Sequence, residues 1–268
     1  NHNKEGTVKA TKAVDRKGFI KKSLAGAAGI AFAGSARASL YHPEPSLQQP
    51  ERKIVYRTLG KTGLKLPVIS MGVMNTDNPA LIGAALDNGI NHLDTAHGYG
   101  NEEVIGGTLK GRPRDSFIIA TKVHGIKMDT PRETEKAFLD EFHLSLRRLG
   151  LDYVEILYLH GVGIVTNRAN TLYEPFLNVL QKIKKSGKAR FVGVSAHRNQ
   201  PEIIQAAIDS KVYDVVLAAY NFTYGNRGKV KQAIAKAAQA GLGIVAMKTL
   251  AGGYLDWAFL RGTYERER

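Results

Sequence analysis

The feature that most constrains the fold is a regular alternation of short β-rich runs with longer amphipathic runs, which begins near Lys53. Crossovers of helical length between successive strands predict parallel pairing. Seven such strands in a row favour an α/β fold of the TIM-barrel type, (β/α)8, over an open sheet. The expected strands cover residues 68–73, 91–94, 117–122, 154–160, 191–195, 215–220 and 243–247. The expected helices cover residues 79–88, 102–110, 131–149, 175–186, 201–210 and 229–240.

Both ends of this pattern are distinctive. The run "KIVYRTLGKTGLKLP" predicts an N-terminal hairpin whose turn contains Gly60 and Gly63. After the seventh strand the sequence continues as "LAGGYLDWAFLRGTYERER", in which no eighth β/α unit is recognisable. We therefore expect residues 53–268 to form a barrel that is incomplete at its C-terminus, with its last β/α unit missing.

The first 38 residues have the pattern of an export signal. A basic stretch precedes an apolar run from Leu24 to Ala36, and the small-x-small sequence Ala36-Arg37-Ala38 precedes Ser39. The pair Arg16-Lys17 is similar to a twin-arginine motif with one conservative replacement. Residues 39–52 have the composition of a linker. This pattern predicts an exported, periplasmic protein without stable membrane insertion after cleavage; the alternative is an N-terminal extension on a cytoplasmic protein.

Composition narrows the functional classes. The chain has 268 residues and 43% hydrophobic content, enough for one large core. It contains no Cys, which excludes thiolate nucleophiles, Cys-ligated metal centres and disulfides. The formal charge is +14, but the first 38 residues hold eight basic and two acidic residues. Elsewhere basic and acidic residues are interleaved, so we expect no nucleic-acid partner.

Polar side chains follow three neighbouring expected strands, at the end of the barrel where active sites lie. Asp94 ends the second strand and Tyr99 lies in the loop after it, in "NHLDTAHGYG". Lys122 ends the third expected strand, and His160 ends the fourth. Each residue alone has an ordinary structural explanation. Together they predict one site that contains a carboxylate, a phenol, an ammonium and an imidazole.

This combination suits the reduction of a carbonyl group. Hydride addition leaves an alkoxide that must be protonated, and a phenol with an ordinary pKa near 10 is a weak donor at neutral pH. We expect Lys122 to lower the pKa of Tyr99 by about 1–3 units and Asp94 to hold the ammonium in place. His160 would hydrogen-bond the carbonyl oxygen. Because no side chain donates hydride, the chemistry requires a nicotinamide cofactor.

From Lys53 to Asp256 the chain resembles the aldo-keto reductases. The resemblance is carried by "YRTLGKTGLKLPVISMGVM", "LDTAHGYGNEEVIG", "IIATKVHG", "LYLH" and "FVGVSAH". It implies NADP(H), or less often NAD(H), as cofactor, a small-molecule carbonyl substrate, and the four roles above for Asp94, Tyr99, Lys122 and His160. It also implies that Ser195 contacts the nicotinamide carboxamide. The residues in "VAMKTLAGG", among them Met247, Lys248 and Leu250, would lie along the cofactor.

Three positions depart from the family pattern. Ala196 replaces an Asn, Leu217 replaces a Gln, and Met247 replaces an aromatic residue that stacks on the nicotinamide ring. A thioether can pack against the ring but has no π-face. We therefore expect a weaker grip on the carboxamide. The substrate and the oligomeric state are not indicated by the sequence.

Two other functions are compatible with these residues. A metal-dependent barrel hydrolase would use His92, Asp94, His160 and His197 as ligands, although Lys122 stands where a further ligand would be expected. A non-catalytic, nicotinamide-binding module with a regulatory or redox-sensing role would keep the same residues without turnover.

Overall fold

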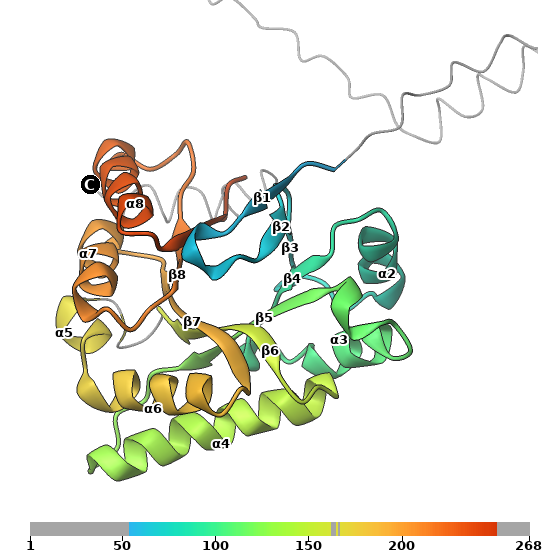
Figure 1. Ribbon diagram of the computed structural model, residues 1–268, viewed down its shortest axis with the longest axis horizontal. Helices are drawn as coiled ribbons and strands as arrows, with labels where there is room; N and C mark the ends of the chain where they lie inside the picture. Colours follow the sequence, from blue (N-terminus) through green and yellow to red (C-terminus); the bar gives the residue numbers. More distant parts are fainter. Residues whose placement is uncertain (1–53, 162–164, 166, 251–268) are drawn as a thin grey trace, which may run out of the picture. The chain divides into compact units, whose positions relative to one another are not determined.

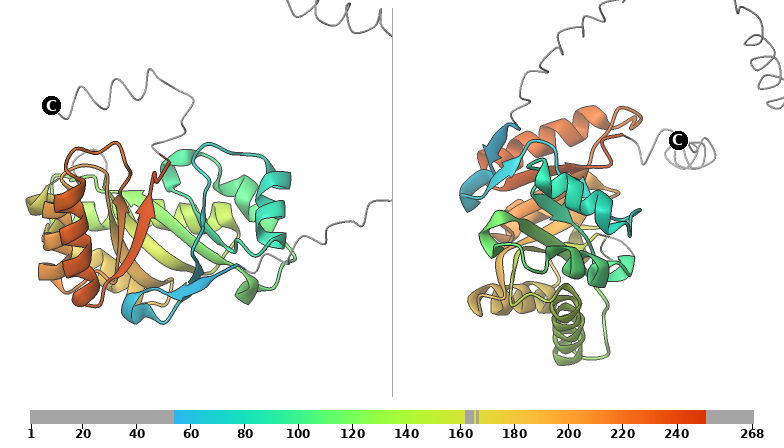
Figure 2. Two further views of the ribbon diagram at one scale, coloured as in Figure 1. Left: turned by 90° about the horizontal axis from the view of Figure 1, so that it is seen from above. Right: turned by 90° about the vertical axis from the view of Figure 1, so that its right-hand side faces the viewer.

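A computed structural model describes residues 54–161, 165 and 167–250. Its main sheet contains seven strands in the order β3-β4-β5-β6-β7-β8-β9, and every neighbouring pair is parallel. The sheet curves, and helices cover its outer face (Figures 1 and 2). The strands are β3 (Met71–Gly72), β4 (His92–Asp94), β5 (Ile118–His124), β6 (Val154–His160), β7 (Ala189–Ala196), β8 (Val215–Ala219) and β9 (Gly243–Met247). This is the predicted α/β barrel architecture.

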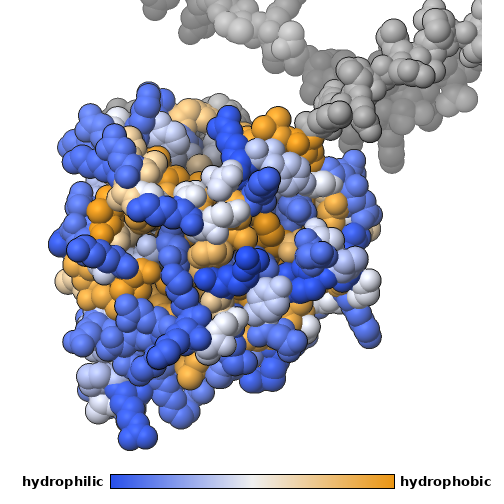
Figure 3. Space-filling model, in the orientation of Figure 1, coloured by the Kyte–Doolittle hydropathy of each residue, from blue (hydrophilic) through white to orange (hydrophobic). Residues whose placement is uncertain are grey.

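Helices or short helical turns connect successive strands. The connections are α2 (Pro79–Asp87), the 3-10 turn η2 (His97–Tyr99), α3 (Glu102–Leu109), the 3-10 turn η3 (Arg114–Ser116), α4 (Pro131–Leu149), α5 (Arg168–Thr171), α6 (Glu174–Lys185), α7 (Gln200–Ser210) and α8 (Arg227–Gln239). Hydrophilic and apolar residues are interleaved over the face drawn in Figure 3. Within the described residues, none of the helices combines the length and the apolar character that a membrane span requires.

The predicted hairpin lies against the amino end of the sheet. Strands β1 (Tyr56–Thr58) and β2 (Lys65–Pro67) pair antiparallel around the 3-10 turn η1 (Gly60–Thr62). Leu59, Leu64 and Leu66 are buried in a cluster that also contains side chains of β5, β6 and β8. The hairpin thus fills the interior at the amino end, and the carboxyl ends of the strands remain for a site.

The bounds of α4 agree with the predicted range of residues 131–149, and local capping interactions set them. The hydroxyl of Thr130 accepts a hydrogen bond from the backbone N–H of Glu133, whose carboxylate accepts one from the N–H of Thr130. Pro131 occupies the first turn, and Gly150 ends the helix in the left-handed conformation. This exact match of bounds reflects capping that does not depend on distant residues.

Other predicted bounds differ by a few residues, and one difference matters for the site. β5 was expected to end at Lys122, but it continues to His124, which pairs with His160 of β6. Lys122 is therefore an interior strand residue. The predicted signal (1–38), the linker (39–52) and the prediction about a missing last β/α unit concern residues outside the described ranges. Among the described residues, β3 and β9 are the edge strands.

Two adjacent glycines of α3 provide a test of the packing between α3 and α4. A β-carbon at Gly106 would lie 2.6 Å from the carbonyl oxygen of Leu149, whereas one at Gly107 would meet nothing within 4 Å. We expect Gly106→Ala to lower the free energy of unfolding by about 1–3 kcal/mol. Gly107→Ala should raise it by about 0.5–1 kcal/mol through helix propensity. Urea denaturation measures both, and equal effects would contradict the close approach.

Candidate active site

The candidate site is centred on the ammonium of Lys122. Its Nζ donates to Oδ1 of Asp94 and, at 2.6 Å, to the backbone carbonyl of Thr95, and it lies 3.5 Å from the hydroxyl of Tyr99. Lys122 is 1% exposed and the carboxylate of Asp94 16%. A cation this deeply buried requires compensating partners, and the structure supplies a carboxylate and a carbonyl. Lys122 thus lies against two of the other three predicted catalytic residues, Asp94 and Tyr99.

The turn that carries Tyr99 is held by Asn101, two residues further along the chain. The side chain of Asn101 donates to the carbonyls of Val73 (2.6 Å) and Thr76 (3.0 Å), and it accepts from the hydroxyl of Thr95 (2.9 Å). These bonds join the loop after β3 to the loop after β4. The phenol is therefore presented by a turn that is fixed on both sides.

The pKa of Tyr99 is shifted in the opposite direction to the expected one. Burial raises the pKa of Tyr99, the positive charge of Lys122 acts against this rise, and the negative charge of Asp94 adds to it. The prediction of a lowered pKa was wrong in its net direction because it considered the lysine and not the desolvation of the phenol. Tyr99 is consequently protonated at neutral pH in the structure described.

The fourth predicted residue, His160, lies beside the phenol. Its ring centroid is 6.1 Å from that of Tyr99 in an edge-on arrangement. On its other sides are His124, stacked at 4.9 Å, and His197, at 5.7 Å. The sequence reasoning missed His124 because the expected strand ended two residues too early. The alternation of side chains along β5 would have placed it on the same face as Lys122.

The imidazoles of His92, His160 and His197 are held neutral. Burial, followed by the charge of Lys122, lowers the pKa of His160 to about 2. Burial, followed by the charge of Lys248, lowers the pKa of His197 to about 3. His92, whose Nδ1 lies 2.9 Å from the hydroxyl of Ser70, has its pKa lowered to about 4, again first by burial. Neutral imidazoles at physiological pH can each donate one hydrogen bond.

The lowered pKa values of His92 and His160 predict that the protein loses stability as the pH falls. Below about pH 6.5 the unfolded chain takes up protons that His92 and His160 do not accept in the fold, so the free energy of unfolding should fall as pH falls, by up to about 1.4 kcal/mol per pH unit for each histidine. Urea denaturation at about pH 7, 6 and 5 measures this slope. His160→Gln should have the shallower slope, and identical slopes in both proteins would contradict the assignment.

The predicted cofactor-binding residues lie at the ends of β7 and β9. Ser195 is fully buried, and its hydroxyl accepts from the N–H of Gly161 at 2.7 Å, which leaves its proton free to donate. Met247 ends β9. Lys248 has a left-handed backbone (φ 56°), and its carbonyl accepts from the amide of Asn221. Leu250 is 72% exposed.

These residues fit a nicotinamide group in part. Ser195 has a hydroxyl proton for a carboxamide, and Nε2 of His197 is buried without a hydrogen-bond partner among the described residues. Ala196 and Leu217 are buried, and Leu217 packs in the interior cluster. Apolar groups thus occupy the two positions where the family pattern has amides.

The residues proposed as metal ligands for a hydrolase do not gather around one point. In the described part of the chain no group of three or more His, Asp or Glu side chains is arranged to hold a metal ion. Asp94 pairs with Lys122, and His92 contacts Ser70. The arrangement offers an acid, a buried cation and neutral imidazoles, a set suited to proton transfer beside a polarised carbonyl.

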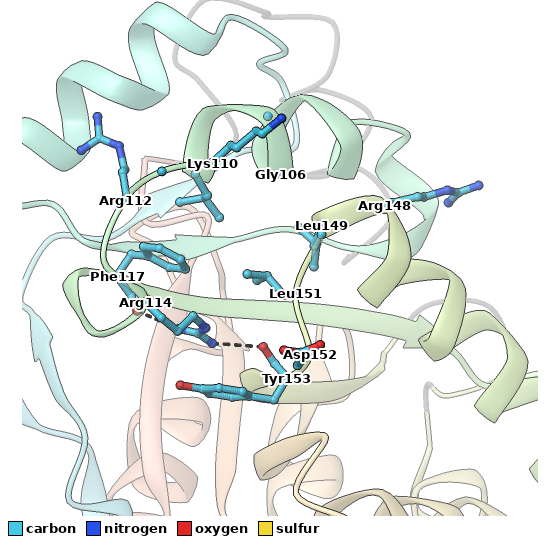
Figure 4. A pocket seen from close by; sticks show the side chains of 14 residues that line it. Gly106, Lys110, Arg112, Arg114, Phe117, Arg148, Leu149, Leu151, Asp152 and Tyr153 are labelled. Carbon is cyan, nitrogen blue, oxygen red and sulfur yellow. Dashed lines mark hydrogen bonds between the residues drawn. The ribbon is translucent and has the colours of Figure 1, made fainter.

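A separate pocket of about 610 Å³ lies at the amino ends of β5 and β6, between the last turns of α3 and α4 (Figure 4). Its three arginines already have carboxylate partners: Arg112 with Asp87 at 2.8 Å, Arg114 with Glu155 at 2.9 Å, and Arg148 with Glu102 at 3.7 Å. Arg114 also donates to the carbonyl of Tyr153. None of the predicted site residues lines this pocket.

Comparisons with known proteins decide the family. The sequence model described as "Aldo/keto reductase family" matches residues 71–267. The chain belongs to the aldo-keto reductase family. The L-glyceraldehyde 3-phosphate reductase of Escherichia coli is 32% identical over 247 residues, covering 83% of this chain and 69% of that protein. The L-galactose dehydrogenase of Arabidopsis thaliana is 35% identical over 160 residues, covering 53% and 49%.

Solved structures of aldo-keto reductases agree with this assignment. The holo form of an enzyme from Bacillus halodurans superposes with a TM-score of 0.61 at 26% identity, covering 76% of this chain and 70% of that one. An enzyme from Klebsiella pneumoniae in complex with NADP and acetate gives 0.59 at 26% identity, covering 76% and 71%. The family consists of oxidoreductases, so the comparisons do not favour the hydrolase or the non-catalytic module.

Proposed function

We propose that this aldo-keto reductase uses NADP(H) to reduce the carbonyl group of a small molecule to an alcohol, with Tyr99 as the general acid. The observation that carries the proposal is the position of Lys122 Nζ, bonded to Asp94 and 3.5 Å from the Tyr99 hydroxyl, with His160 at the edge of the phenol ring. The Klebsiella pneumoniae relative in complex with NADPH supports the choice of cofactor.

The reduced nicotinamide, when bound, supplies the hydride that adds to the carbonyl carbon. Ser195, Met247, Lys248 and Leu250 are the residues proposed to hold it, with the Ser195 hydroxyl donating to the carboxamide. Met247 would pack on the ring through dispersion contacts. A side chain of this kind fits a flat, apolar ring face without requiring a stacking aromatic.

The proton for the new alcohol comes from Tyr99. As the carbonyl double bond becomes a single bond, the oxygen gains negative charge and takes the phenolic proton, which leaves a phenolate. The raised pKa of Tyr99 keeps the acid protonated before the reaction. The positive charge of the Lys122 ammonium then stabilises the phenolate that is left after the proton transfer.

His160 is proposed to orient the carbonyl. Its low pKa keeps the ring neutral, so one ring nitrogen can donate a hydrogen bond to the carbonyl oxygen without competing as an acid with Tyr99. Donors aimed at an oxygen that becomes negative stabilise the transition state more than the ground state.

The proposal is tested by following the absorbance of the reduced nicotinamide after purified protein is mixed with a short aldehyde. We expect oxidation that depends on both protein and aldehyde, faster with NADPH than with NADH, and formation of the alcohol in equal amount. Cofactor oxidation without alcohol, or no reaction with any of a set of aldehydes, ketones and open-chain sugars, would overturn the proposal.

A further inference from the structure

His124 contacts two parts of the candidate site, the ring of His160 and the turn that carries Tyr99. It is the last residue of β5 and pairs in register with His160 of β6. The two imidazoles stack with centroids 4.9 Å apart and planes 16° apart. Because side chains alternate along a strand, His124 projects on the same side of β5 as Lys122. Its ring therefore lies in the same layer as the proposed reacting groups.

The ring of His124 is also held against the turn that carries Tyr99. A β-carbon on Gly98 would lie 2.6 Å from Cε1 of His124 and 3.4 Å from Nε2. Only a residue without a side chain permits this approach. The imidazole thus lies between the backbone of η2 and the ring of His160, in a fixed orientation relative to both.

The nitrogens of His124 are available to a ligand. The residue is partly exposed, and neither ring nitrogen has a hydrogen-bond partner among the described residues. Neither nitrogen is buried. By contrast, Nδ1 of His160 is buried without a partner. A side chain that is held rigidly and still has an accessible donor and acceptor can recognise a polar group of a substrate.

We propose that His124 determines substrate specificity by hydrogen-bonding a hydroxyl on the carbon next to the carbonyl, so that the substrates are 2-hydroxycarbonyl compounds. This inference rests on the proposed function. Two neighbouring oxygens of such a molecule can each contact one ring of a pair stacked 4.9 Å apart, since each hydrogen bond spans about 3 Å. The carbonyl oxygen takes the bond from His160, and the hydroxyl pairs with His124.

The test compares two aldehydes that differ only in this hydroxyl, propanal and 2-hydroxypropanal, as substrates with NADPH. The wild-type protein should have a kcat/KM about tenfold higher for 2-hydroxypropanal, the ratio expected from one hydrogen bond. His124→Phe keeps a flat ring between Gly98 and His160 but removes both nitrogens. It should bring the ratio of the two kcat/KM values close to one, since the hydroxyl contact is lost.

Two further variants separate recognition from packing. His124→Gln retains a donor and an acceptor and should keep part of the preference. His143→Phe makes the same replacement on α4, where the ring of His143 lies 6.3 Å from that of Phe142, and should leave the ratio unchanged. Saturation-transfer NMR with propane-1,2-diol and propan-1-ol provides a readout without turnover. Stronger saturation of the diol should be seen with wild-type protein and not with His124→Phe.

Each outcome has a definite meaning. A wild-type ratio near one, or a preference that persists unchanged in His124→Phe, overturns the role of His124 and leaves carbonyl reduction standing if propanal is reduced. Failure of wild-type protein to reduce either aldehyde, together with equal saturation of the two alcohols, overturns the inference together with the proposed function.

Discussion

Replacing Tyr99 with Phe should lower kcat/KM for carbonyl reduction by about a thousandfold, within the range that a positioned general acid contributes. The phenyl ring preserves the edge-on contact with His160 and removes only the atom that Lys122 Nζ approaches to 3.5 Å. Binding of NADPH, measured by quenching of intrinsic fluorescence, should change little, because none of the proposed cofactor residues is altered.

Tyr153→Phe is the matched control for this variant. Tyr153 stacks against the guanidinium of Arg114 at 4.0 Å (Figure 4). It directly precedes β6, whereas His160 ends that strand, so the loss of the Tyr153 hydroxyl should leave reduction unchanged. An active Tyr99→Phe protein would contradict the general-acid role. A wild-type protein that binds NADPH but is as inactive as Tyr99→Phe would instead support the non-catalytic module.

Replacing Lys122 with Met should lower the free energy of unfolding by about 3 kcal/mol, because it leaves the carboxylate of Asp94 in the barrel without its cation. Met has a similar length, so the change removes charge and hydrogen bonds more than volume. Reduction should also fall steeply, since the phenolate of Tyr99 would lose its stabilising charge. Chemical denaturation and steady-state kinetics measure the two effects.

The double variant Lys122→Met with Asp94→Asn identifies the origin of the loss. Replacing both members of a buried pair is often close to neutral, so stability should largely recover. Activity should not recover, because the charge beside Tyr99 is still missing. If the loss of unfolding free energy in the double variant equalled the sum of the losses in the two single variants, the ion pair would not explain the instability. The lost packing of the Lys122 side chain would then be its cause.

The candidate site was predictable to the extent that its residues follow strands. Asp94, Tyr99, Lys122 and His160 were identified because parallel strands bring their carboxyl ends together, and the structure places all four side by side. His124 was not identified, because the end of β5 depends on its pairing with β6. Pairing between distant segments leaves no local signal in a run such as "TKVHG".

The sequence by itself determined the helices and strands and the chemical groups of the candidate site. Capping residues and apolar periodicity are local properties, so α4 and the order of strands could be read from neighbouring residues. Only the tertiary structure decided the sign of the shift in the pKa of Tyr99 and the contact of His124 with His160. Both depend on what surrounds a side chain in space: desolvation is the sum of all atoms that replace water, and ring stacking requires the register of two strands.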